Sequence, residues 1–365
     1  MIKKKILVTG GHFTSALSIV EALDRNMFDV IWIGQKYTML FDKNTSLEFN
    51  DITSRGIKFI NLHAGKLYRY MSWKAVISLV LIPIGLIESF FILLKEKPSL
   101  VLTFGGYIGA TTAISAKILG IKIYTHEQTL NIGLANKLIF YLADIIFLGW
   151  KETESEVPVS KRDNIIITGN PIRKEILEEK NNLVEFNNDK KTILISCGNQ
   201  GAHRINEIIF NQLEQLTHEY NIIHLTGSNT IFNDYEYANK LIENNKFENY
   251  RVFKNLLSSD YSKALHQSDM LIGRSGANTV YELGALKKPS ILIPLPFAQN
   301  NEQLKNAEIL KSYGLAEIIE EKNMTDIILL NSIKKVLHKD VMIETSNSFK
   351  TNASEIVAEY ISKNI

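Results

Sequence analysis

One three-part pattern recurs along this chain of 365 residues and constrains its fold more than any other feature. An apolar run at residues 6–8 leads into a glycine turn at 9–12 and then into an amphipathic run at 15–23. The same order returns at 192–216 and at 270–286. Strand, tight turn and helix in alternation predict parallel sheets covered by helices, so we expect an α/β fold.

Length and composition narrow the class of protein. A chain of 365 residues exceeds the size of one ordinary core, so two domains are expected, with a boundary close to Asn170, after a predicted strand at 165–168. The net charge of +2, with no basic stripe, argues against a nucleic-acid partner. The single cysteine, Cys197, excludes an internal disulfide and suits a reducing compartment.

The third repeat has the composition of a phosphate-binding turn. Gly273 and Gly276 leave room for a ligand to approach the backbone, and the helix that follows directs free N–H groups at the same point. Thr279 adds a hydroxyl, and Glu282, about one turn further on, is placed to accept bonds from ribose hydroxyls. These residues predict a nucleotide diphosphate site. The alternative is an ordinary strand-to-helix connection.

Polar side chains follow other predicted strands. His12 ends the first turn, and His126 and Glu127 follow the strand predicted at 121–125. Ligands of open α/β sheets bind at the carboxyl ends of the strands, where a histidine can act as a general base. The alternative roles are helix capping for His12 and backbone hydrogen bonding for His126 and Glu127.

The most apolar stretch lies at 75–94 and is nearly long enough to span a bilayer. Pro83 and Glu88 interrupt it, and a carboxylate at the bilayer centre costs about 2.5 kcal/mol or more. We therefore expect a helix packed partly on the sheet and partly presented to a membrane surface, with a fully buried crossover helix as the alternative. An interfacial patch of cations and aromatics precedes it: Lys66, Tyr68, Arg69, Tyr70 and Trp73.

Several motifs occur together in an order that resembles one family. They are Thr9-Gly10-Gly11-His12, Gly105-Gly106-Tyr107, His126-Glu127-Gln128, Gly169-Asn170-Pro171-Ile172-Arg173, Gly198-Asn199-Gln200-Gly201-Ala202, Arg274-Ser275-Gly276-Ala277, and Gln303 with Asn306. This set is similar to that of the MurG family of N-acetylglucosaminyltransferases. The resemblance implies a GT-B fold, with two Rossmann-like, doubly wound domains. Residues 1–169, joined by a C-terminal helix at about 350–365, would face the acceptor and the membrane, and residues 170–349 would bind the UDP-sugar.

The resemblance also implies roles for individual residues. His12 and Glu127 would be catalytic. UDP-GlcNAc would be bound by Thr9, Gly10, Gly11, Thr129, Arg173, Asn199, Ala277, Asn278, Thr279, Val280, Tyr281, Glu282 and Gln303. The acceptor would be bound by Tyr107, His126, Gln128 and Asn136. Thr129 and Asn199 depart from the family, which has asparagine and serine at these positions, and the first glycine turn is shorter than usual.

The expected reaction is an inverting transfer of GlcNAc from UDP-GlcNAc to a polyprenyl-diphosphate-linked muramyl-pentapeptide. The protein would act as a peripheral enzyme on the cytoplasmic face of the cell membrane, with no metal and no other cofactor. Three alternatives stay open: a glycosyltransferase for another lipid acceptor, a UDP-GlcNAc epimerase of the same fold, and a subunit that binds the nucleotide sugar without turnover. A nicotinamide enzyme is disfavoured because the first turn lacks the full G-x-G-x-x-G pattern.

Overall fold

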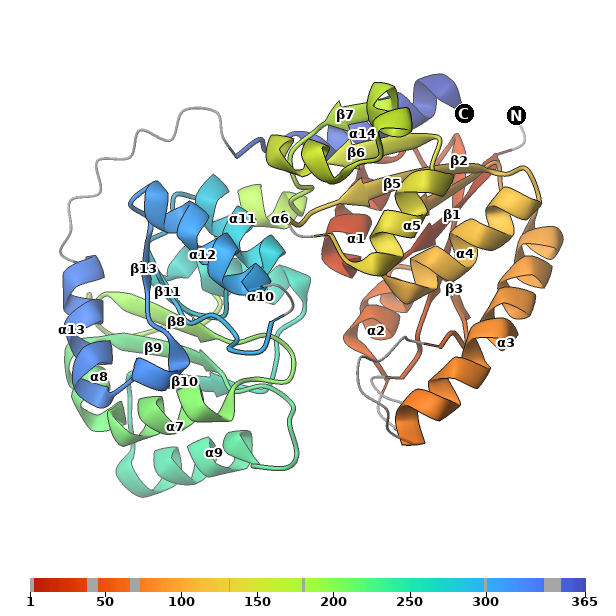
Figure 1. Ribbon diagram of the computed structural model, residues 1–365. Helices are drawn as coiled ribbons and strands as arrows, with labels where there is room; N and C mark the ends of the chain where they lie inside the picture. Colours follow the sequence, from red (N-terminus) through yellow and green to blue (C-terminus); the bar gives the residue numbers. More distant parts are fainter. Residues whose placement is uncertain are drawn as a thin grey trace. The chain divides into compact units, whose positions relative to one another are not determined.

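The chain forms two compact units, each built around its own sheet (Figure 1). The computed structural model describes residues 3–37, 45–65, 73–130, 132–178, 181–298, 301–337 and 349–365, without the side chains of 73–77. Unit 1 is Met1–Arg173 with Lys350–Ile365, and unit 2 is Lys174–Phe349. Arg173 therefore belongs to unit 1, whereas the sequence analysis placed it in the second domain. The predicted patch at Lys66, Tyr68, Arg69 and Tyr70 lies outside the described residues.

Unit 1 holds a seven-stranded parallel sheet in the order β3-β2-β1-β4-β5-β6-β7. Its strands are β1 (Lys4–Thr9), β2 (Phe28–Gly34), β3 (Lys58–Asn61), β4 (Leu100–Thr103), β5 (Lys122–Glu127), β6 (Ile145–Leu148) and β7 (Ile165–Ile167). The order reverses between β1 and β4, which is the topological switch point of a doubly wound sheet.

Alternate residues of the unit 1 strands face two different helix layers, because side chains of a strand point to opposite faces in turn. Ile6 and Val8 pack towards α1 (Phe13–Ala22) and α14 (Ala353–Asn364), with Ile52 of α2 (Leu47–Ser54) in the same cluster. Leu7 packs in a separate cluster on the other face. That face is covered by α3 (Trp73–Glu96), α4 (Gly106–Ile118) and α5 (Leu134–Leu142), which lie side by side (Figure 1).

Unit 2 repeats the doubly wound topology with six parallel strands in the order β10-β9-β8-β11-β12-β13. They are β8 (Thr192–Ser196), β9 (Asn221–Leu225), β10 (Tyr250–Phe253), β11 (Met270–Gly273), β12 (Ser290–Leu292) and β13 (Ala316–Ile318). The strand order reverses between β8 and β11, so unit 2 has its own switch point.

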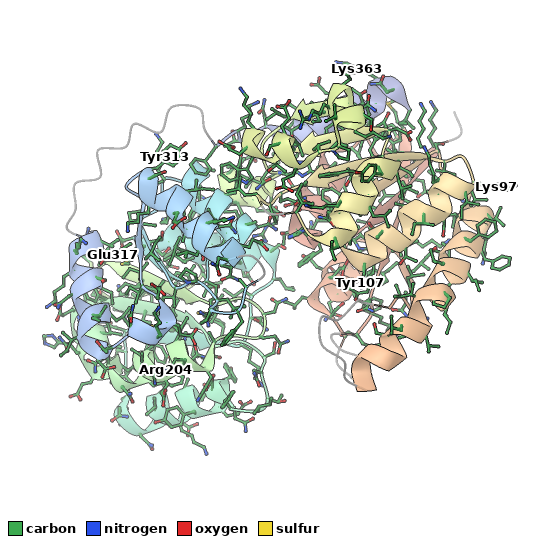
Figure 2. The ribbon with its side chains drawn as sticks, viewed as in Figure 1. Lys97, Tyr107, Arg204, Tyr313, Glu317 and Lys363 are labelled. Atoms are coloured by element: carbon green, nitrogen blue, oxygen red, sulfur yellow. The ribbon has the colours of Figure 1, made fainter. Side chains whose placement is uncertain are left out.

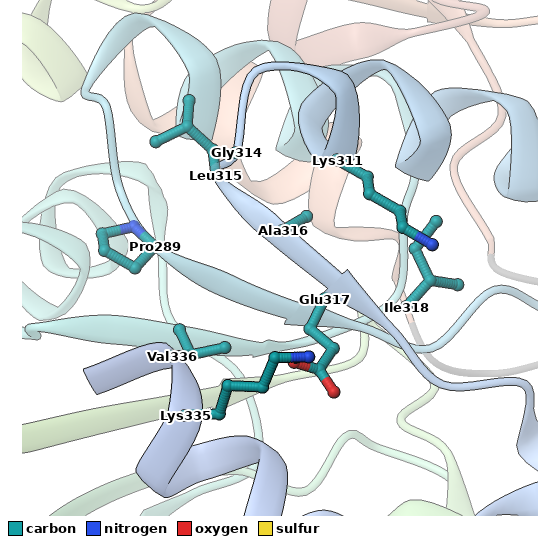
Figure 3. A pocket seen from close by; sticks show the side chains of 9 residues that line it. All are labelled: Pro289, Lys311, Gly314, Leu315, Ala316, Glu317, Ile318, Lys335 and Val336. Carbon is teal, nitrogen blue, oxygen red and sulfur yellow. The ribbon is translucent and has the colours of Figure 1, made fainter. Parts of the chain in front are cut away.

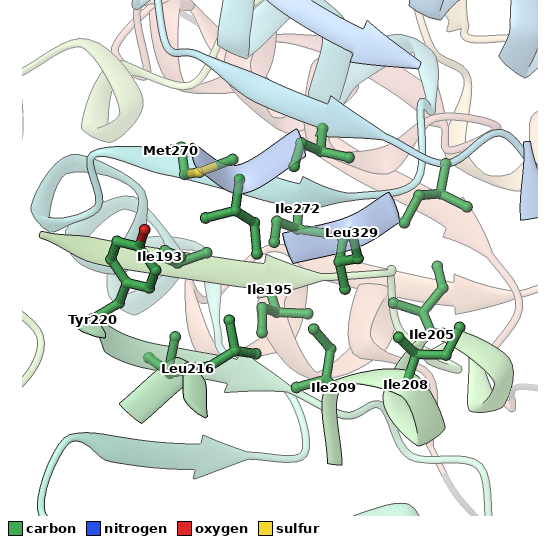
Figure 4. Close-up of a cluster of buried hydrophobic side chains, with 14 of the residues drawn as sticks. Ile193, Ile195, Ile205, Ile208, Ile209, Leu216, Tyr220, Met270, Ile272 and Leu329 are labelled. Carbon is green, nitrogen blue, oxygen red and sulfur yellow. The ribbon is translucent and has the colours of Figure 1, made fainter. Parts of the chain in front are cut away.

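The core of unit 2 lies between its sheet and the helices α7 (His203–Asn211), α8 (Leu213–Glu219) and α13 (Asp326–Leu337). Figure 4 shows Ile193, Ile195 and Ile272 of the central strands meeting Ile209 and Leu329 of these helices. The other helices of the unit are α6 (Lys174–Glu178), α9 (Asp234–Asn245), α10 (Ser258–Gln267), α11 (Ala277–Ala285) and α12 (Glu302–Ser312).

The long apolar stretch is one 24-residue helix, α3, which continues through Pro83. The part at Ser78–Glu96 is long and apolar enough to cross a membrane, and only 22% of this apolar stretch is buried inside the protein. One face of the helix is fixed to unit 1: Ser89 and Ser115 of α4 share a 2.6 Å hydrogen bond, and Glu88 accepts a bond from the His63 amide. The opposite face leaves six large apolar side chains 43–63% exposed: Leu79, Val80, Ile84, Ile87, Phe91 and Leu94.

Candidate functional site

The first turn of unit 1 is packed tightly against the loop that follows β4. Thr9 pairs with Thr103 in the sheet register, so the turns that follow β1 and β4 emerge next to each other. A Cβ atom on Gly11 would lie 2.4 Å from the carbonyl oxygen of Phe104, closer than any side chain allows. The turn therefore requires glycine at this position.

Thr9 does not reach the surface of this turn. Its side chain is fully buried, and its hydroxyl donates a 3.0 Å hydrogen bond to the hydroxyl of Thr103. The hydroxyl joins two strand ends, and binding of UDP-GlcNAc by Thr9 stays a prediction.

His12 precedes the first residue of α1 and is half-buried. Its Nδ1 atom lies 3.5 Å from the carbonyl oxygen of Phe104, at the outer limit of a hydrogen bond. Because a carbonyl can only accept, this contact favours the tautomer with the proton on Nδ1. The lone pair then resides on Nε2, which is the form a general base requires.

Glu127 lies inside β5, not beyond it, and both of its carboxylate oxygens are occupied. Oε1 accepts bonds from the amide and the hydroxyl of Thr129, at 2.9 and 2.7 Å, and Oε2 accepts a bond from the side-chain amide of Asn136. Asn136 in turn accepts a 2.9 Å bond from the Gly106 amide. The buried carboxylate thus positions Asn136, and Asn136 positions the loop after β4, while the catalytic role of Glu127 stays a prediction.

His126 and Gln128 also point into the protein. His126 is 1% exposed, its Nε2 donates to the carbonyl of Gly169 at 3.1 Å, and its Nδ1 accepts a bond from Gln128 at 3.1 Å. Burial lowers the pKa of His126 to about 3, so the ring is neutral. Gln128 is fully buried. These two side chains fix the ends of β5 and β7, and acceptor binding by His126 and Gln128 stays a prediction.

The remaining predicted residues of unit 1 have different surroundings. Tyr107 lies in the first turn of α4 and is half-buried (Figure 2), so it stays a candidate acceptor contact. Thr129 is 5% exposed and is held by Glu127. Arg173 is 6% exposed and ends the segment that follows β7.

In unit 2, the predicted diphosphate site is the start of α11. Gly276 caps this helix without a side-chain hydrogen bond, and the first intrahelical bond runs from the Val280 amide to the Gly276 carbonyl. The amides of residues 277–279 therefore come before the first amide that donates a hydrogen bond within the helix, as at the start of any α-helix. A Cβ on Gly276 would meet no atom within 4 Å, so this point is open to a ligand. Asn278 and Thr279 are half-buried there, and Ala277 is 7% exposed.

Two predicted donor contacts are core residues. Val280 and Tyr281 are each 1% exposed, and the Tyr281 ring makes an edge contact with Phe349 at 5.3 Å. Their side chains therefore stabilise unit 2, and the contact of Val280 and Tyr281 with UDP-GlcNAc stays a prediction. Glu282 is 6% exposed, one turn into α11.

Gln303, in the first turn of α12, and Asn199, on the loop after β8, lie at the same edge of the unit 2 sheet. Gln303 follows β12 and accepts a 2.9 Å bond from the Leu295 amide through Oε1, and its carbonyl accepts a 2.7 Å bond from Ser275. Ser275 thereby links the loop after β11 to the start of α12. Asn199, after β8, has an exposed side chain, while its carbonyl accepts bonds from the amide and the hydroxyl of Ser228 at 2.9 Å each.

The sequence analysis missed a chain of polar side chains beside the loop after β8. Tyr250 donates to Nδ1 of His224 at 2.9 Å, and Nε2 of His224 donates to Asn206 at 3.0 Å. Asn206 then donates to one oxygen of Asp234 at 2.8 Å, and Nδ1 of His203 donates to the other oxygen at 2.7 Å. Burial lowers the pKa of His224 to about 3, which keeps this histidine neutral within the chain. No local motif signals the arrangement, because its members come from two helices and two strands.

A cavity in unit 2 lies away from all of these residues. Figure 3 shows it beside the edge strand β13, lined by Pro289, Lys311, Gly314, Leu315, Ala316, Glu317, Ile318, Lys335 and Val336. None of the predicted site residues lines it. Within the described parts of the chain, no group of three or more His, Cys, Asp or Glu side chains is arranged to hold a metal ion.

Comparisons with known proteins cover nearly the whole chain. Residues 9–147 match the glycosyltransferase family 28 N-terminal domain, and residues 192–360 match the glycosyltransferase family 28 C-terminal domain. A protein of Clostridium kluyveri is 31% identical over 91% of each chain, and one of Shouchella clausii is 30% identical over 99% of each chain. Both are named UDP-N-acetylglucosamine–N-acetylmuramyl-(pentapeptide) pyrophosphoryl-undecaprenol N-acetylglucosamine transferase.

Solved structures share the fold at lower identity. MurG of Acinetobacter baumannii has a TM-score of 0.68 at 23% identity and covers 99% of this chain and 100% of its own. A UDP-GlcNAc 2-epimerase from Neisseria meningitidis, bound to UDP-GlcNAc, has a TM-score of 0.66 at 17% identity and covers 99% of this chain and 100% of its own. The GT-B fold predicted from the sequence is thereby confirmed.

Proposed function

Because the chain belongs to glycosyltransferase family 28, and within it to the MurG family, we propose that it transfers GlcNAc from UDP-GlcNAc to lipid I. Lipid I is the undecaprenyl-diphosphate-linked N-acetylmuramyl-pentapeptide, and attack by its 4-hydroxyl forms lipid II. The observation that carries this conclusion is the match to curated transferases at 30–31% identity over at least 91% of both chains.

The start of α11 is our candidate for the donor diphosphate. A helix N-terminus carries a partial positive charge and unused amides, and this one opens at Gly276 into free space. Asn278 and Thr279 add polar side chains in the same turn. Glu282 is the candidate partner for the ribose hydroxyls. These groups stabilise the charge that develops on UDP as it leaves, without a metal.

His12 is our candidate for the general base. The hydroxyl proton of the acceptor moves to Nε2, the acceptor oxygen bonds to the anomeric carbon of GlcNAc, and the bond from that carbon to the diphosphate oxygen breaks. UDP departs with the electron pair, and the anomeric configuration inverts. The tautomer favoured by the Phe104 carbonyl supports this role, since it leaves the Nε2 lone pair free.

The exposed face of α3 supports peripheral attachment to the cytoplasmic face of the membrane. Val80, Ile84, Ile87, Phe91 and Leu94 recur at intervals of three or four residues, so they form one stripe along the helix. A stripe of this kind binds the interfacial region of a bilayer. The bond between Ser89 and Ser115 ties the other face of α3 to the domain, which favours lying on the membrane over crossing it.

The test is transfer of labelled GlcNAc from UDP-GlcNAc to a lipid I analogue by the purified protein. We expect a lipid II analogue, and we expect His12→Ala to lower kcat by a factor of about 10² to 10⁴ while UDP binding stays near the wild-type level. Transfer by His12→Ala at the wild-type rate would remove His12 from the mechanism. Because UDP-GlcNAc epimerases share the fold, a parallel reaction without acceptor tests the alternative: conversion of free UDP-GlcNAc to its epimer would contradict the transferase assignment.

A further inference from the structure

Glu48 is a carboxylate at the ligand-binding edge of unit 1 that neither the motifs nor the mechanism uses. It lies in the first turn of α2, and its Oε1 accepts a 2.7 Å hydrogen bond from the indole N–H of Trp32. A Cβ placed on Gly10 would lie 2.1 Å from that oxygen, and one placed on Gly34 would lie 2.8 Å from it. The carboxyl group is therefore pressed against the backbone of the first glycine turn and of the end of β2.

The start of α2 is fixed, so Glu48 cannot swing away from the turn by moving its helix. Ser46 caps the helix by accepting a 3.1 Å bond from the Phe49 amide. The Ser46 amide donates to the carbonyl of Lys36 at 2.8 Å, and the Ser46 hydroxyl donates to the carbonyl of Gln35 at 2.8 Å. The last two bonds clamp the helix start to the segment that follows β2.

The protonation of this carboxyl changes near neutral pH. Burial raises the pKa of Glu48 to about 7, although the hydrogen bond from Trp32 acts in the opposite direction. Among the described residues no cation forms an ion pair with it. The titratable or charged groups on the surrounding elements are His12 on the first turn, Lys36 and Tyr37 after β2, Asp51 and Arg55 on α2, and Lys58 on β3. Asp51 pairs with Arg55, and Lys58 pairs with Glu96.

We propose that Glu48 is a positioning residue of the first glycine turn, and that the turn admits the diphosphate of a substrate when this carboxyl is neutral and repels it when the carboxyl is ionised. The inference rests on the proposed function, in which both the donor and the acceptor carry a diphosphate. In the neutral form Glu48 supports Gly10 without adding charge. In the ionised form it places a negative charge directly behind the turn, in a partly buried setting where charges interact more strongly than in water.

Direct binding measurements show whether the diphosphate at the turn belongs to UDP-GlcNAc or to lipid I. Dissociation constants for UDP-GlcNAc and for a lipid I analogue in detergent are measured on the full-length protein at pH 6.0, 7.0 and 8.5. Diphosphate diesters stay fully ionised over this range, so a change in affinity reports on the protein. We expect one of the two constants to rise roughly tenfold between pH 6.0 and 8.5, the scale of a charge repulsion across several ångströms. Whichever constant changes identifies the substrate whose diphosphate lies at the turn.

Two variants separate Glu48 from other groups. Glu48→Gln keeps an acceptor for Trp32 but cannot ionise, so the affinity should stay at its low-pH value throughout. Trp32→Phe removes the bond that lowers the pKa of Glu48, so the loss of affinity should move to higher pH. A pH dependence that came from any other group would persist unaltered in Glu48→Gln.

The proposal is overturned if neither constant depends on pH in the wild type, or if Glu48→Gln shows the wild-type dependence. Circular dichroism of each variant verifies that it is folded. Because binding is measured without turnover, the outcome is independent of the transfer assay. Loss of transfer with an intact pH dependence of binding would count against the proposed reaction and not against Glu48.

Discussion

Replacing Asn206 by alanine should destabilise unit 2 and loosen the loop after β8. Asn206 is fully buried and makes three side-chain bonds: to the Thr226 carbonyl at 2.9 Å, to Asp234 at 2.8 Å and from His224 at 3.0 Å. With about 1 kcal/mol for each bond between neutral groups and about 2 kcal/mol for the bond to the carboxylate, the expected loss in the free energy of unfolding is about 4 kcal/mol. For a unit of this size, Tm should fall by roughly 10 °C.

The Asn206→Ala substitution should also disturb the edge of the unit 2 sheet that is proposed to bind UDP-GlcNAc. A Cβ on Gly201 would lie 1.9 Å from the Thr226 carbonyl oxygen, so the loops after β8 and β9 are in direct contact at the carbonyl that Asn206 holds. We therefore expect the KM for UDP-GlcNAc to rise more than the KM for the acceptor.

Differential scanning calorimetry and steady-state kinetics measure the two effects. The matched control is Asn211→Ala, on the exposed end of the same helix, which should cost less than about 0.5 kcal/mol. Equal stability of Asn206→Ala and Asn211→Ala would refute the reasoning, because it would mean that the polar chain contributes nothing.

Three further predictions concern other parts of the molecule. Gly11→Ala should reduce transfer at least tenfold, because its Cβ would collide with the Phe104 carbonyl and displace the loop after β4; steady-state kinetics check this, and normal transfer would contradict it. Phe91→Glu should weaken binding to anionic lipid vesicles in a flotation assay, since it places a charge on the exposed stripe of α3, and unchanged flotation would exclude the stripe from the contact. In the folded protein, burial lowers the pKa values of His126 and His224 to about 3, below the ordinary 6.5. Their neutral forms therefore contribute fully to the free energy of unfolding above pH 6.5, and this contribution is lost as pH falls towards 3. Urea unfolding should show a free energy of unfolding that declines by up to about 1.4 kcal/mol per pH unit for each histidine, and a flat profile from pH 6 to 4 would contradict this.

Much of the fold could be predicted from the sequence because the strands beside the two switch points, β1, β4, β8 and β11, are short apolar runs that end at a glycine or within two residues of one. The three repeats identified in the sequence each form a strand, a turn and a helix, as β1 and α1, β8 and α7, and β11 and α11. The pair α2 and β3 was missed because β3 has only four residues and is only partly buried, although a turn at Gly56 precedes it. Likewise α9 is mainly polar, and β13 is a three-residue edge strand.

The site was harder to predict than the fold. Sequence places His126 and Glu127 at the end of an apolar run, but it cannot tell where the strand stops. β5 continues through both residues, so their side chains point into the protein and bond to neighbouring loops. Glu48 was missed for the opposite reason. Its importance depends on contacts with Gly10, Trp32 and Gly34, which are distant in sequence and meet only when α2 is clamped to the sheet.

The return of α14 to unit 1 has a practical consequence for how this protein can be fused to others. Lys4, at the start of β1, donates a hydrogen bond to the carbonyl of Ile365, and Lys122, at the start of β5, donates one to Asn364 at 2.9 Å. Residues 4 and 365 therefore lie together at the amino ends of the strands, on the side of this sheet away from the glycine turns. An affinity tag or fluorescent reporter attached at either terminus would leave the candidate substrate-binding edge of unit 1 unobstructed.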